Sequence, residues 1–410
     1  MRILIQSINF APELTGIGKY TGELAEWLVS RGHDVTVVTA VPYYPQWSVA
    51  AGYRAWRWTR ERHAGALVIR CPLWVPSRPS GLKRLLHLVS FALSSLPVMI
   101  AQAAGRPDVV LVVEPPLVCA PVAAMTALLA GGKSWLHVQD FEVDAAFSLG
   151  VLHGGLPSRL ALRIERFLMA RFSRVSTISP QMVERLAEKG VDEACTLLFS
   201  NWIDGDVIFP LPTSPLRAEL GFREDAIVAL YSGTMNKKQG LSLLAEAAQR
   251  LPNISFVFCG EGLERARLIE ATTGCGNVRF LPLQPLDRLN SLMNLADIHL
   301  LPQLPGAADL VMPSKLQGMF ASGRPVIATA DPETQLGKTV RDCGLLVPPG
   351  DLEAFVSALE ELSSDRARRL ELGINAREHA MQNWGKEKVL LEFEAQLIMT
   401  QQPLPEEMKL

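Results

Sequence analysis

Short apolar runs alternate with helical patterns along the first half of this chain. Residues 2–8 form a β-rich run, a glycine-bearing loop follows, and a helical pattern runs from about Thr21 to Ser30. Further apolar runs that predict strands cover 34–40, 67–71, 108–113, 134–138 and 174–178. A strand, a loop, a helix and a second strand in this order begin a parallel α/β sheet.

The same alternation restarts after the proline-containing stretch 207–215, where we place a domain boundary. The apolar runs of this second half cover 226–233, 254–260, 277–282, 297–302, 324–329 and 344–349. Because these runs are apolar throughout, helices should cover both faces of each sheet. We therefore expect an α/β fold of two Rossmann-like, doubly wound parallel-sheet domains facing a cleft. The expected domains are 1–206 and 207–384, and residues 385–410 should form a helix that packs back toward the N-terminal domain.

Length and composition agree with more than one folded domain. The chain has 410 residues, of which 48% are apolar and 20% are charged, so it can bury enough surface to offset its ordering entropy. The six cysteines form no CxxC pair, which favours reduced thiols in the cytoplasm. The formal net charge of -2 argues against a uniformly basic protein, so we expect no nucleic-acid partner.

No targeting or membrane-spanning segment is predicted. The apolar run at the start of the chain breaks at Asn9 and Pro12, which makes it shorter than the core of a signal peptide. Residues 85–104 have about the length that crosses hydrocarbon, but they include His87, Pro97 and several other polar positions. We expect this segment to form a helix in a protein core or against a membrane interface.

A glycine-rich loop follows the first predicted strand, at the edge where open α/β sheets bind ligands. It contains Gly16 and Gly18 in a GxGxxxG spacing, one residue longer than a dinucleotide fingerprint. No acid ends the second strand, so NAD binding is a weak interpretation. The glycines still allow a ligand to approach backbone N–H groups at the start of a helix.

The first strand of the second half also ends at a glycine. Ser232 and Gly233 close the strand, and Lys237 and Lys238 precede the next helix. Two ammonium groups beside a helix N-terminus suit a diphosphate, although a solvated lysine pair is the alternative. The sequence has no GxxxxGK[ST] motif, which disfavours P-loop nucleotide hydrolysis.

Two later loops of the second half carry similar groups. The next strand ends in a second glycine turn, made of Gly260, Glu261 and Gly262. After the strand at 297–302, a loop leading into a helix carries a carboxylate, a hydroxyl and an ammonium, which belong to Asp309, Ser314 and Lys315.

Three acids at alternate positions follow the strand at 134–138. They are Asp140, Glu142 and Asp144, and burying them without partners would be costly. At least one of them should serve as a cap or a surface acid. Asp140 lies closest to the strand end and is the candidate for a ligand site.

Two acidic patterns match the spacing of functional motifs, but their positions in the chain disfavour a functional role. Asp204-Gly205-Asp206 has the DxD form that binds a divalent metal in some sugar-nucleotide enzymes, but it lies in the approach to the linker. Glu353 and Glu361 have the E-x7-E spacing, but they lie on a charged helix where a solvated face is favoured. We assign no metal ligand.

A basic, tryptophan-bearing stretch occupies residues 47–87. It holds eight basic residues and one acid, Glu61, so it carries +7 and leaves -9 for the rest of a chain whose total is -2. With the apolar segment after it, this stretch suits an anionic membrane surface, and the alternative is a basic edge on a soluble enzyme. The residues predicted for this surface are Trp56, Arg57, Trp58, Arg60, Lys83 and Arg84.

These motifs, taken in order, resemble the retaining glycosyltransferases of the GT4 family, which have the GT-B fold. The likeness covers nearly the whole chain and includes PELTGIGKYTGELAEWLVSRGHDVTVVT, YSGTMNKKQGL, FCGEGLERARL and MPSKLQGMFASGRPVIAT. A closer likeness is to the fucosyltransferases of colanic-acid-type exopolysaccharide clusters, through SINFAPELTGIGKYTGE, TAVPYYPQW and VQDFEVDA.

By position, the resemblance implies a donor site in the second half. It places the donor diphosphate at Gly233 and Lys238 and the nucleotide pocket at 260–262, while the loop 16–18 would approach from the other side. The residues implied at the donor phosphate and sugar are Ser314, Lys315 and Leu316.

Two positions depart from the family pattern. The second Glu of the family's E-x7-E pair aligns with Gly318, and the nearest acid is Asp309. The family's phosphate-binding Lys aligns with Gln239, so Lys238 or Lys237 would take its place. The catalytic candidates are therefore Asp140, Lys238 and Asp309.

The resemblance implies an enzyme that transfers L-fucose from GDP-fucose to a lipid-diphosphate-linked saccharide. It also implies a cytoplasmic protein, peripheral on the inner membrane, that prefers a GDP-sugar to a UDP-sugar and uses no metal or other cofactor. One alternative is a nucleotide-sugar-binding component of a polysaccharide assembly complex that has lost catalysis. Another is an NAD-dependent sugar epimerase or dehydrogenase.

Overall fold

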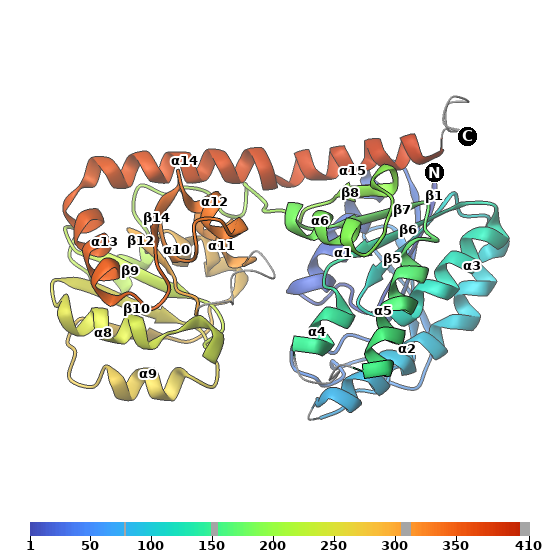
Figure 1. The fold of residues 1–410 in the computed structure, drawn as a ribbon, viewed down its shortest axis with the longest axis horizontal. Helices are drawn as coiled ribbons and strands as arrows, with labels where there is room; N and C mark the ends of the chain where they lie inside the picture. The colour runs from blue at the N-terminus through green and yellow to red at the C-terminus, as the bar shows by residue number, and fades with distance from the viewer. Residues whose placement is uncertain (78, 149–154, 305–312, 402–410) are drawn as a thin grey trace. The chain divides into compact units, whose positions relative to one another are not determined.

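Two α/β units make up the chain (Figure 1). The computed structural model describes residues 1–77, 79–148, 155–304 and 313–401. Unit 1 takes Met1–Ser200 and Leu390–Leu410, and unit 2 takes Asn201–Val389. The divisions therefore fall after residues 200 and 389, where the sequence pattern suggested 206 and 384.

Unit 1 is built on an eight-stranded sheet in the order β3-β4-β2-β1-β5-β6-β7-β8. Every neighbouring pair is parallel except β3 with β4, which is antiparallel. The strands are β1 (Arg2–Ser7), β2 (Asp34–Ala40), β3 (Thr59–His63), β4 (Ala66–Cys71), β5 (Val109–Glu114), β6 (Lys133–Val138), β7 (Arg174–Thr177) and β8 (Thr196–Leu198).

Helices cover both faces of this sheet, as continuous apolar strands require. Right-handed crossovers put α2, α3, α5 and α6 on one face and α1 on the other, because the chain moves in opposite directions along the sheet on the two sides of β1. The helices are α1 (Gly16–Ser30), α2 (Gly81–Gln102), α3 (Ala120–Ala130), α4 (Glu142–Ser148), α5 (Gly155–Met169) and α6 (Pro180–Glu188). Short 3-10 turns lie at Ala103–Gly105, Leu117–Cys119 and Glu193–Cys195.

The last turns of α15 (Lys386–Gln401) belong to unit 1 and are held by specific contacts. The Phe393 ring stacks on Phe199 at 4.0 Å between centroids and meets Trp135 edge-on at 5.0 Å. The Glu394 carboxylate pairs with Arg31 and His33 at 3.1 and 2.9 Å. Aromatic packing, the Arg31 ion pair and the His33 contact therefore fix this helix end to unit 1.

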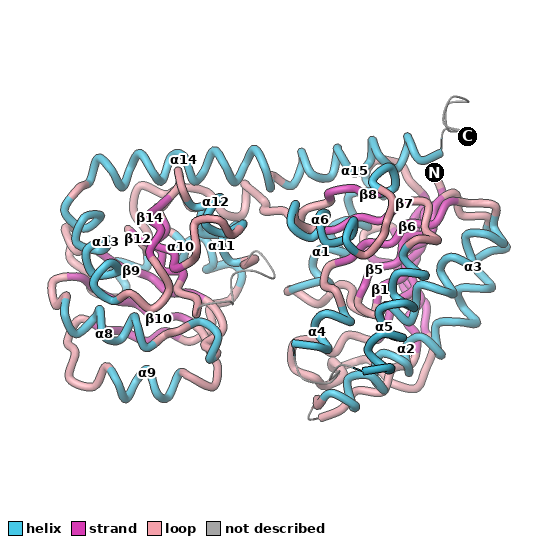
Figure 2. The backbone as a smooth tube through the Cα atoms, viewed as in Figure 1, coloured by secondary structure: helices cyan, strands magenta, loops and turns pink. Residues whose placement is uncertain are grey.

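Unit 2 is built on a six-stranded parallel sheet in the order β11-β10-β9-β12-β13-β14 (Figure 2). Its strands are β9 (Ile227–Ser232), β10 (Ile254–Cys259), β11 (Val278–Leu281), β12 (Ile298–Leu301), β13 (Val326–Thr329) and β14 (Gly344–Val347). Its helices are α7 (Pro215–Glu219), α8 (Ser242–Arg250), α9 (Arg265–Ala271), α10 (Leu289–Met293), α11 (Lys315–Ala321), α12 (Gln335–Val340), α13 (Leu352–Ser364) and α14 (Arg366–Trp384). The 3-10 turns Lys237–Gln239 and Leu286–Arg288 complete it.

The twelve predicted strands are all present, and the described residues contain two more. β3 has the polar sequence TRERH at the sheet edge, and β8 has three residues, so neither gives an apolar run. The predicted glycine loop is different in the structure, because α1 begins at Gly16 instead of near Thr21. Gly18 and Gly22 lie inside this helix, where the segment 11–13 packs too closely for a side chain at either position.

Candidate functional site

The loops after β9 and β10 cross at very short range in unit 2. The Gly233 N–H donates to the Cys259 carbonyl at 3.0 Å, and the Met235 N–H donates to the Glu261 carbonyl at 2.8 Å. A Cβ at Gly260 would lie 2.0 Å from the Gly233 oxygen, and its φ of +141° is one that other residues rarely adopt. Glycine is therefore required where the two strand-end turns touch.

Lys315 lies beside this crossing, at the start of α11. Its side chain passes Gly233, where a Cβ would meet the lysine Cδ at 3.3 Å, and its Nζ lies 4.4 Å from the centre of the Tyr231 ring. The Nζ is buried and has no hydrogen-bond partner among the described residues. Burial lowers the pKa of Lys315 from 10.5 to about 8. A buried ammonium with unused hydrogen-bond donors is a ready partner for an anion.

The other residues predicted for this site lie nearby in different settings. Ser314 is exposed immediately before α11, and Lys237 and Glu261 are exposed in the glycine turns. Leu316 is fully buried in the core of unit 2, and its N–H donates to the Pro313 carbonyl. Asp309 lies outside the described residues, and so does the side chain of Lys238.

In unit 1, a buried acid that was not among the predicted site residues, Glu13, packs against the glycine-rich segment. The Glu13 carboxylate accepts hydrogen bonds from the backbone N–H groups of Tyr43 and Tyr44, both at 2.9 Å, and from Asn9 Nδ2 at 2.8 Å. A Cβ at Gly18 would come within 2.7 Å of the Glu13 side chain. Gly18 therefore makes room for Glu13, while Gly16 stays exposed.

The expected acid triplet after β6 divides into different roles. Asp140 is exposed at the strand end, whereas Glu142 accepts the Leu117 N–H at 2.7 Å and Asp144 pairs with Lys189 at 2.9 Å. Glu142 and Asp144 therefore have structural roles, which agrees with the expectation that at least one of the three acids is a cap or a surface acid. Asp140 lies at the carboxyl end of β6, the position for which the sequence proposed it as a ligand-site residue.

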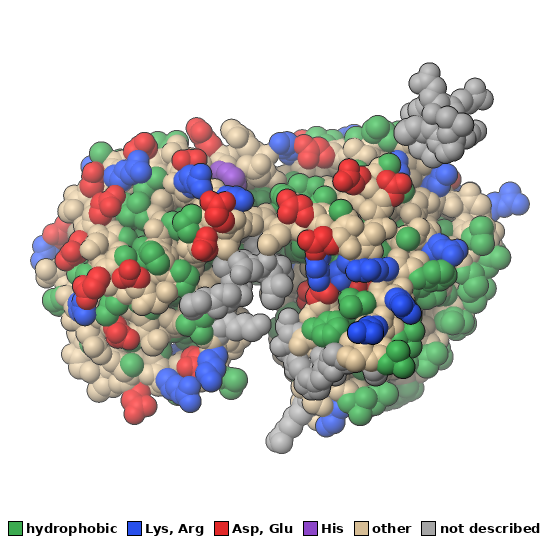
Figure 3. Space-filling view, viewed as in Figure 1, with side chains coloured by type: hydrophobic (Ala, Val, Ile, Leu, Met, Phe, Trp, Pro, Cys, Tyr) green, Lys and Arg blue, Asp and Glu red, His purple; other side chains and the backbone are tan. Residues whose placement is uncertain are grey.

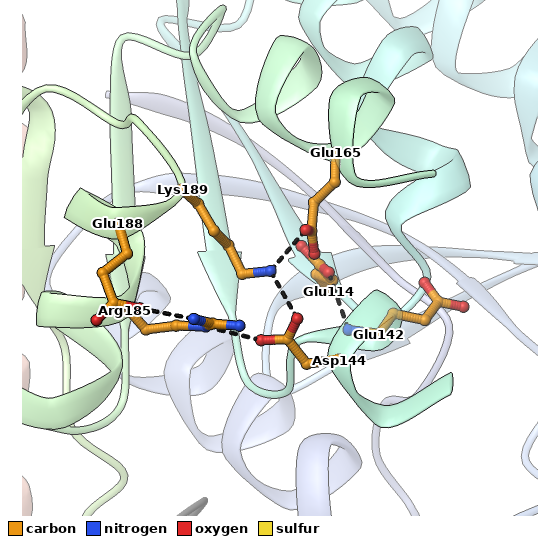
Figure 4. Close-up of polar contacts among 7 residues, drawn as sticks. All are labelled: Glu114, Glu142, Asp144, Glu165, Arg185, Glu188 and Lys189. Carbon is orange, nitrogen blue, oxygen red and sulfur yellow. Dashed lines mark hydrogen bonds and ion pairs between the residues drawn. The ribbon is translucent and has the colours of Figure 1, made fainter. Parts of the chain in front are cut away.

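A buried ionic cluster supports the segment that carries Asp140 (Figure 4). Lys189 Nζ bonds to Glu165 of α5 at 2.6 Å as well as to Asp144, and both Lys189 and Glu165 are buried. Glu114, at the end of β5, accepts the Glu142 N–H at 3.4 Å. Burial raises the pKa of Glu114 well above its usual value, so this carboxyl keeps its proton over a wider pH range. Lys189 thus holds an acid from α4 and an acid from α5, and Arg185 of α6 adds a second cation to Asp144.

The basic, tryptophan-bearing stretch is mostly at the surface of unit 1. The predicted residues Trp56, Arg57, Trp58, Arg60, Lys83 and Arg84 are all exposed. Trp58 Nε1 donates to the Ser94 carbonyl of α2 at 3.1 Å. Arg70 is an exception in this stretch, because it is buried and bonds to the carbonyls of Ala11 and Ala40 and to Glu61.

The two acidic patterns set aside from the sequence have structural partners. Asp204 pairs with Lys386 at 3.1 Å and accepts the Asp206 N–H. Glu353 is exposed on α13 and pairs with Arg250. Within the parts of the chain that the structure describes, no group of three or more His, Cys, Asp or Glu side chains could hold a metal ion.

Comparisons with known proteins match both units. Residues 15–202 match the family described as glycosyl transferase 4-like domain, and residues 213–379 match glycosyl transferases group 1. The protein named "Putative colanic acid biosynthesis glycosyl transferase WcaI" of Escherichia coli (strain K12) is 42% identical over 96% of this chain and 98% of its own length.

Solved structures of low sequence identity share the fold. The sucrose-phosphate synthase of Thermosynechococcus elongatus is 19% identical and has a TM-score of 0.75 over 97% of this chain and 98% of its own. The Anabaena protein HepE, solved in complex with UDP-glucose, is 18% identical and has a TM-score of 0.69 over 97% of this chain and 100% of its own.

Proposed function

This chain belongs to the GT4 family of glycosyltransferases with the GT-B fold, and on that premise we propose that it transfers a sugar from a nucleotide diphosphate sugar to a saccharide in exopolysaccharide synthesis. The enzyme class follows from the family. The process is suggested by the relative named for colanic acid biosynthesis. The donor class is suggested by the fold neighbour that was solved with UDP-glucose.

One observation carries the donor site: beside the crossing of two glycine turns, the buried ammonium of Lys315 has no hydrogen-bond partner in the described parts of the chain. The crossing lies at the carboxyl edge of the unit 2 sheet, where open α/β sheets bind nucleotides. A diphosphate here would supply the anion that Lys315 lacks among the described residues. We therefore assign the donor diphosphate to Lys315, with Lys237 and Lys238 as further cations of the same edge.

The reaction needs a good leaving group more than a protein nucleophile. The bond between the anomeric carbon and the diphosphate oxygen breaks, the acceptor oxygen bonds to that carbon, and the acceptor proton passes to the departing diphosphate. Lys315 would stabilise the negative charge that develops on this leaving group. We propose that Asp140 orients the acceptor hydroxyl.

Within this class we propose L-fucose from GDP-fucose as the donor and a lipid-diphosphate-linked saccharide as the acceptor. The support is the resemblance of the segments around Gly16, Tyr43 and Asp140 to fucosyltransferases of colanic-acid-type clusters. We also propose a cytoplasmic location, peripheral on the inner membrane. The exposed tryptophans and arginines of the stretch 54–62 support that location.

A thermal-shift screen with GDP, UDP and their sugars tests the donor, because a ligand that binds the folded state raises the melting temperature. The proposal expects the largest rise with GDP and GDP-fucose, and a rise with UDP-sugars alone would reject the guanine donor. Transfer or hydrolysis of the bound donor by the purified protein then separates an enzyme from a nucleotide-sugar-binding component. Binding without either reaction would favour the non-catalytic alternative.

A further inference from the structure

Helix α5 exposes a stripe of large apolar residues on the side that faces away from the sheet. Its side toward the sheet carries Ser158, Glu165 and Met169, which are buried, and Glu165 pairs with Lys189. Its other side exposes four large apolar residues at three- and four-residue spacing, namely Leu156, Leu160, Ile164 and Phe167. A helix on the surface of a soluble domain normally turns its apolar stripe to the core.

Two more helices on the same face of the unit 1 sheet expose apolar side chains. On α2 these are Leu82, Leu85, Leu86, Leu93, Leu96 and Ile100. On α3, which is in contact with α2, they are Met125, Leu128 and Leu129. Figure 3 shows hydrophobic side chains gathered over the region where Figure 1 places α2 and α3. We call the exposed apolar residues of α2, α3 and α5, thirteen side chains, the docking face.

The exposed charges that α2, α3 and α5 carry are all of one sign. The exposed charged residues of the three helices are Lys83, Arg84, Arg159, Arg163 and Arg166. The single acid in their sequences is Glu165, which is buried. Just beyond α5, the Arg171 guanidinium lies 4.3 Å from the centre of the Phe167 ring. Large apolar residues edged by arginine and lysine are typical of helices that lie in an anionic membrane interface.

The packing of α2 indicates that it lies on a bilayer and does not cross it. Residues Gly81–Gly105 are long and apolar enough to span by length and composition, the one helix of the described residues that is. The inner side of α2 belongs to the unit 1 core, because Phe91 and Met99 are fully buried and Ser95 accepts a hydrogen bond from Gln6 of β1 at 3.0 Å. A spanning position would remove these groups from the sheet.

We propose that the docking face binds unit 1 to an anionic lipid bilayer. The apolar side chains would enter the boundary between headgroups and acyl chains, and the five cations would contact lipid phosphates. Trp58, bonded to α2 through Ser94, extends the same surface with an aromatic ring suited to an interface. The inference rests on the proposed function, in which the acceptor is linked to a membrane lipid. The docking face is the surface that would hold the enzyme near that acceptor.

The charge pattern favours lipid over a second copy of the chain. In a two-fold dimer the same patch meets itself, so the five cations of one copy would face the five of the other with no exposed acid of these helices between them. Such like-charge contacts are unfavourable. An anionic bilayer satisfies both the apolar and the basic components.

Flotation of the full-length protein with vesicles of phosphatidylcholine and phosphatidylglycerol tests the proposal. The variant Leu160→Glu/Ile164→Glu places two carboxylates at positions that are 55% and 49% exposed, so it should fold normally. Its matched control is Leu370→Glu/Ile374→Glu on α14 of unit 2, at positions 49% and 58% exposed with the same spacing. We expect the α5 variant to partition at least about tenfold more weakly than wild type and the control to partition equally with wild type.

A second variant, Arg159→Gln/Arg163→Gln, tests the charge without touching the apolar stripe. Each arginine near an anionic surface contributes about fivefold to the partition coefficient, so this pair should lower it by about twentyfold or more. Wild type should bind vesicles of pure phosphatidylcholine much more weakly. Equal flotation of wild type and both α5 variants would overturn the proposal. A dimeric wild type and a monomeric Leu160→Glu/Ile164→Glu variant that float equally would also overturn it.

Transfer to a water-soluble acceptor analogue separates this proposal from the proposed function. The α5 variants should keep this transfer, because their residues are remote from the donor residues in sequence and lie on the outer side of a helix. Wild type that floats but transfers no sugar would reject the function alone. Wild type that transfers sugar but does not float would reject the docking face alone.

Discussion

Replacing Lys315 by methionine should make the unliganded protein more stable while removing its affinity for a nucleotide diphosphate. Burial lowers the pKa of Lys315 from 10.5 to about 8, so keeping this ammonium charged in the folded state costs about 3 kcal/mol at neutral pH. The Tyr231 ring, 4.4 Å from Nζ, returns about 1 kcal/mol of that cost. Methionine has a similar shape and no charge, so the variant should gain about 2 kcal/mol.

The gain should depend on pH in a defined direction. Below about pH 8 the lysine is charged in both the folded and the unfolded state, and the full cost is present. Between about 8 and 10.5 the unfolded state binds more protons than the folded state, so wild-type stability rises with pH relative to the variant. The advantage of Lys315→Met should therefore shrink by about 2 kcal/mol between about pH 7 and about pH 9.5.

Urea unfolding at the two pH values measures the difference, and Lys338→Met on α12 is the control because its lysine is exposed. The same variants enter the thermal-shift screen with GDP and UDP. Lys315→Met should lose at least about tenfold in nucleotide affinity. A variant that is less stable than wild type at both pH values, or that binds the nucleotide as well as wild type, would refute this account of the donor site.

Three further outcomes follow from the described contacts. Gly260→Ala should cost at least about 3 kcal/mol of unfolding free energy in urea, because its Cβ would meet the Gly233 oxygen at 2.0 Å, whereas Gly274→Ala should cost only about 1 kcal/mol because its surroundings are open. Lys189→Met should cost about 3 kcal/mol of unfolding free energy at neutral pH and less at acidic pH, where the buried carboxyls take up protons. Equal losses of unfolding free energy at both pH values would argue against the ionic cluster. The same loss in the control Lys133→Met, at an exposed site, would also argue against it. Dialysis against EDTA should leave sugar transfer unchanged, since lysine is proposed to meet the diphosphate charge, and activity restored only by a divalent metal would contradict this.

The strands could be predicted because the strands of a parallel sheet covered on both faces are apolar throughout. Such an apolar run is visible in the local sequence without knowledge of the tertiary contacts. β3 escaped prediction because an edge strand can be polar on both faces, as TRERH is. The start of α1 was misplaced because glycines usually signal a loop. At Gly18 the absence of a side chain serves helix packing against Glu13, a contact that no local pattern reveals.

The candidate site was predictable as a set of loops but not as an electrostatic arrangement. The rule that ligands bind at the carboxyl edge of the sheet located Gly233, Gly260 and Lys315 from the sequence. What the sequence could not give is the burial of Lys315 Nζ, which depends on the crossing of two turns and on a tyrosine from β9. Glu13 was missed because its burial also depends on tertiary contacts. One of its hydrogen-bond donors, Asn9, is nearby in sequence, but the other two are the backbone N–H groups of Tyr43 and Tyr44, about 30 residues later.

The docking face depends on a feature that periodicity leaves undetermined. Apolar residues at three- and four-residue spacing on 155–169 predict an amphipathic helix, but they would equally describe a helix whose apolar stripe lies in the core. The side that faces inward is set by Glu165, whose buried carboxylate needs an ammonium, and Lys189 supplies it from 24 residues further along the chain. This ion pair and the buried Met169 hold one side of α5 inward, and Leu160 and Ile164 lie on the exposed side. Lys189 contacts both Glu165, which orients α5, and Asp144, which lies in the segment that follows Asp140. Loss of Lys189 should therefore weaken vesicle binding as well as lower the stability of the fold.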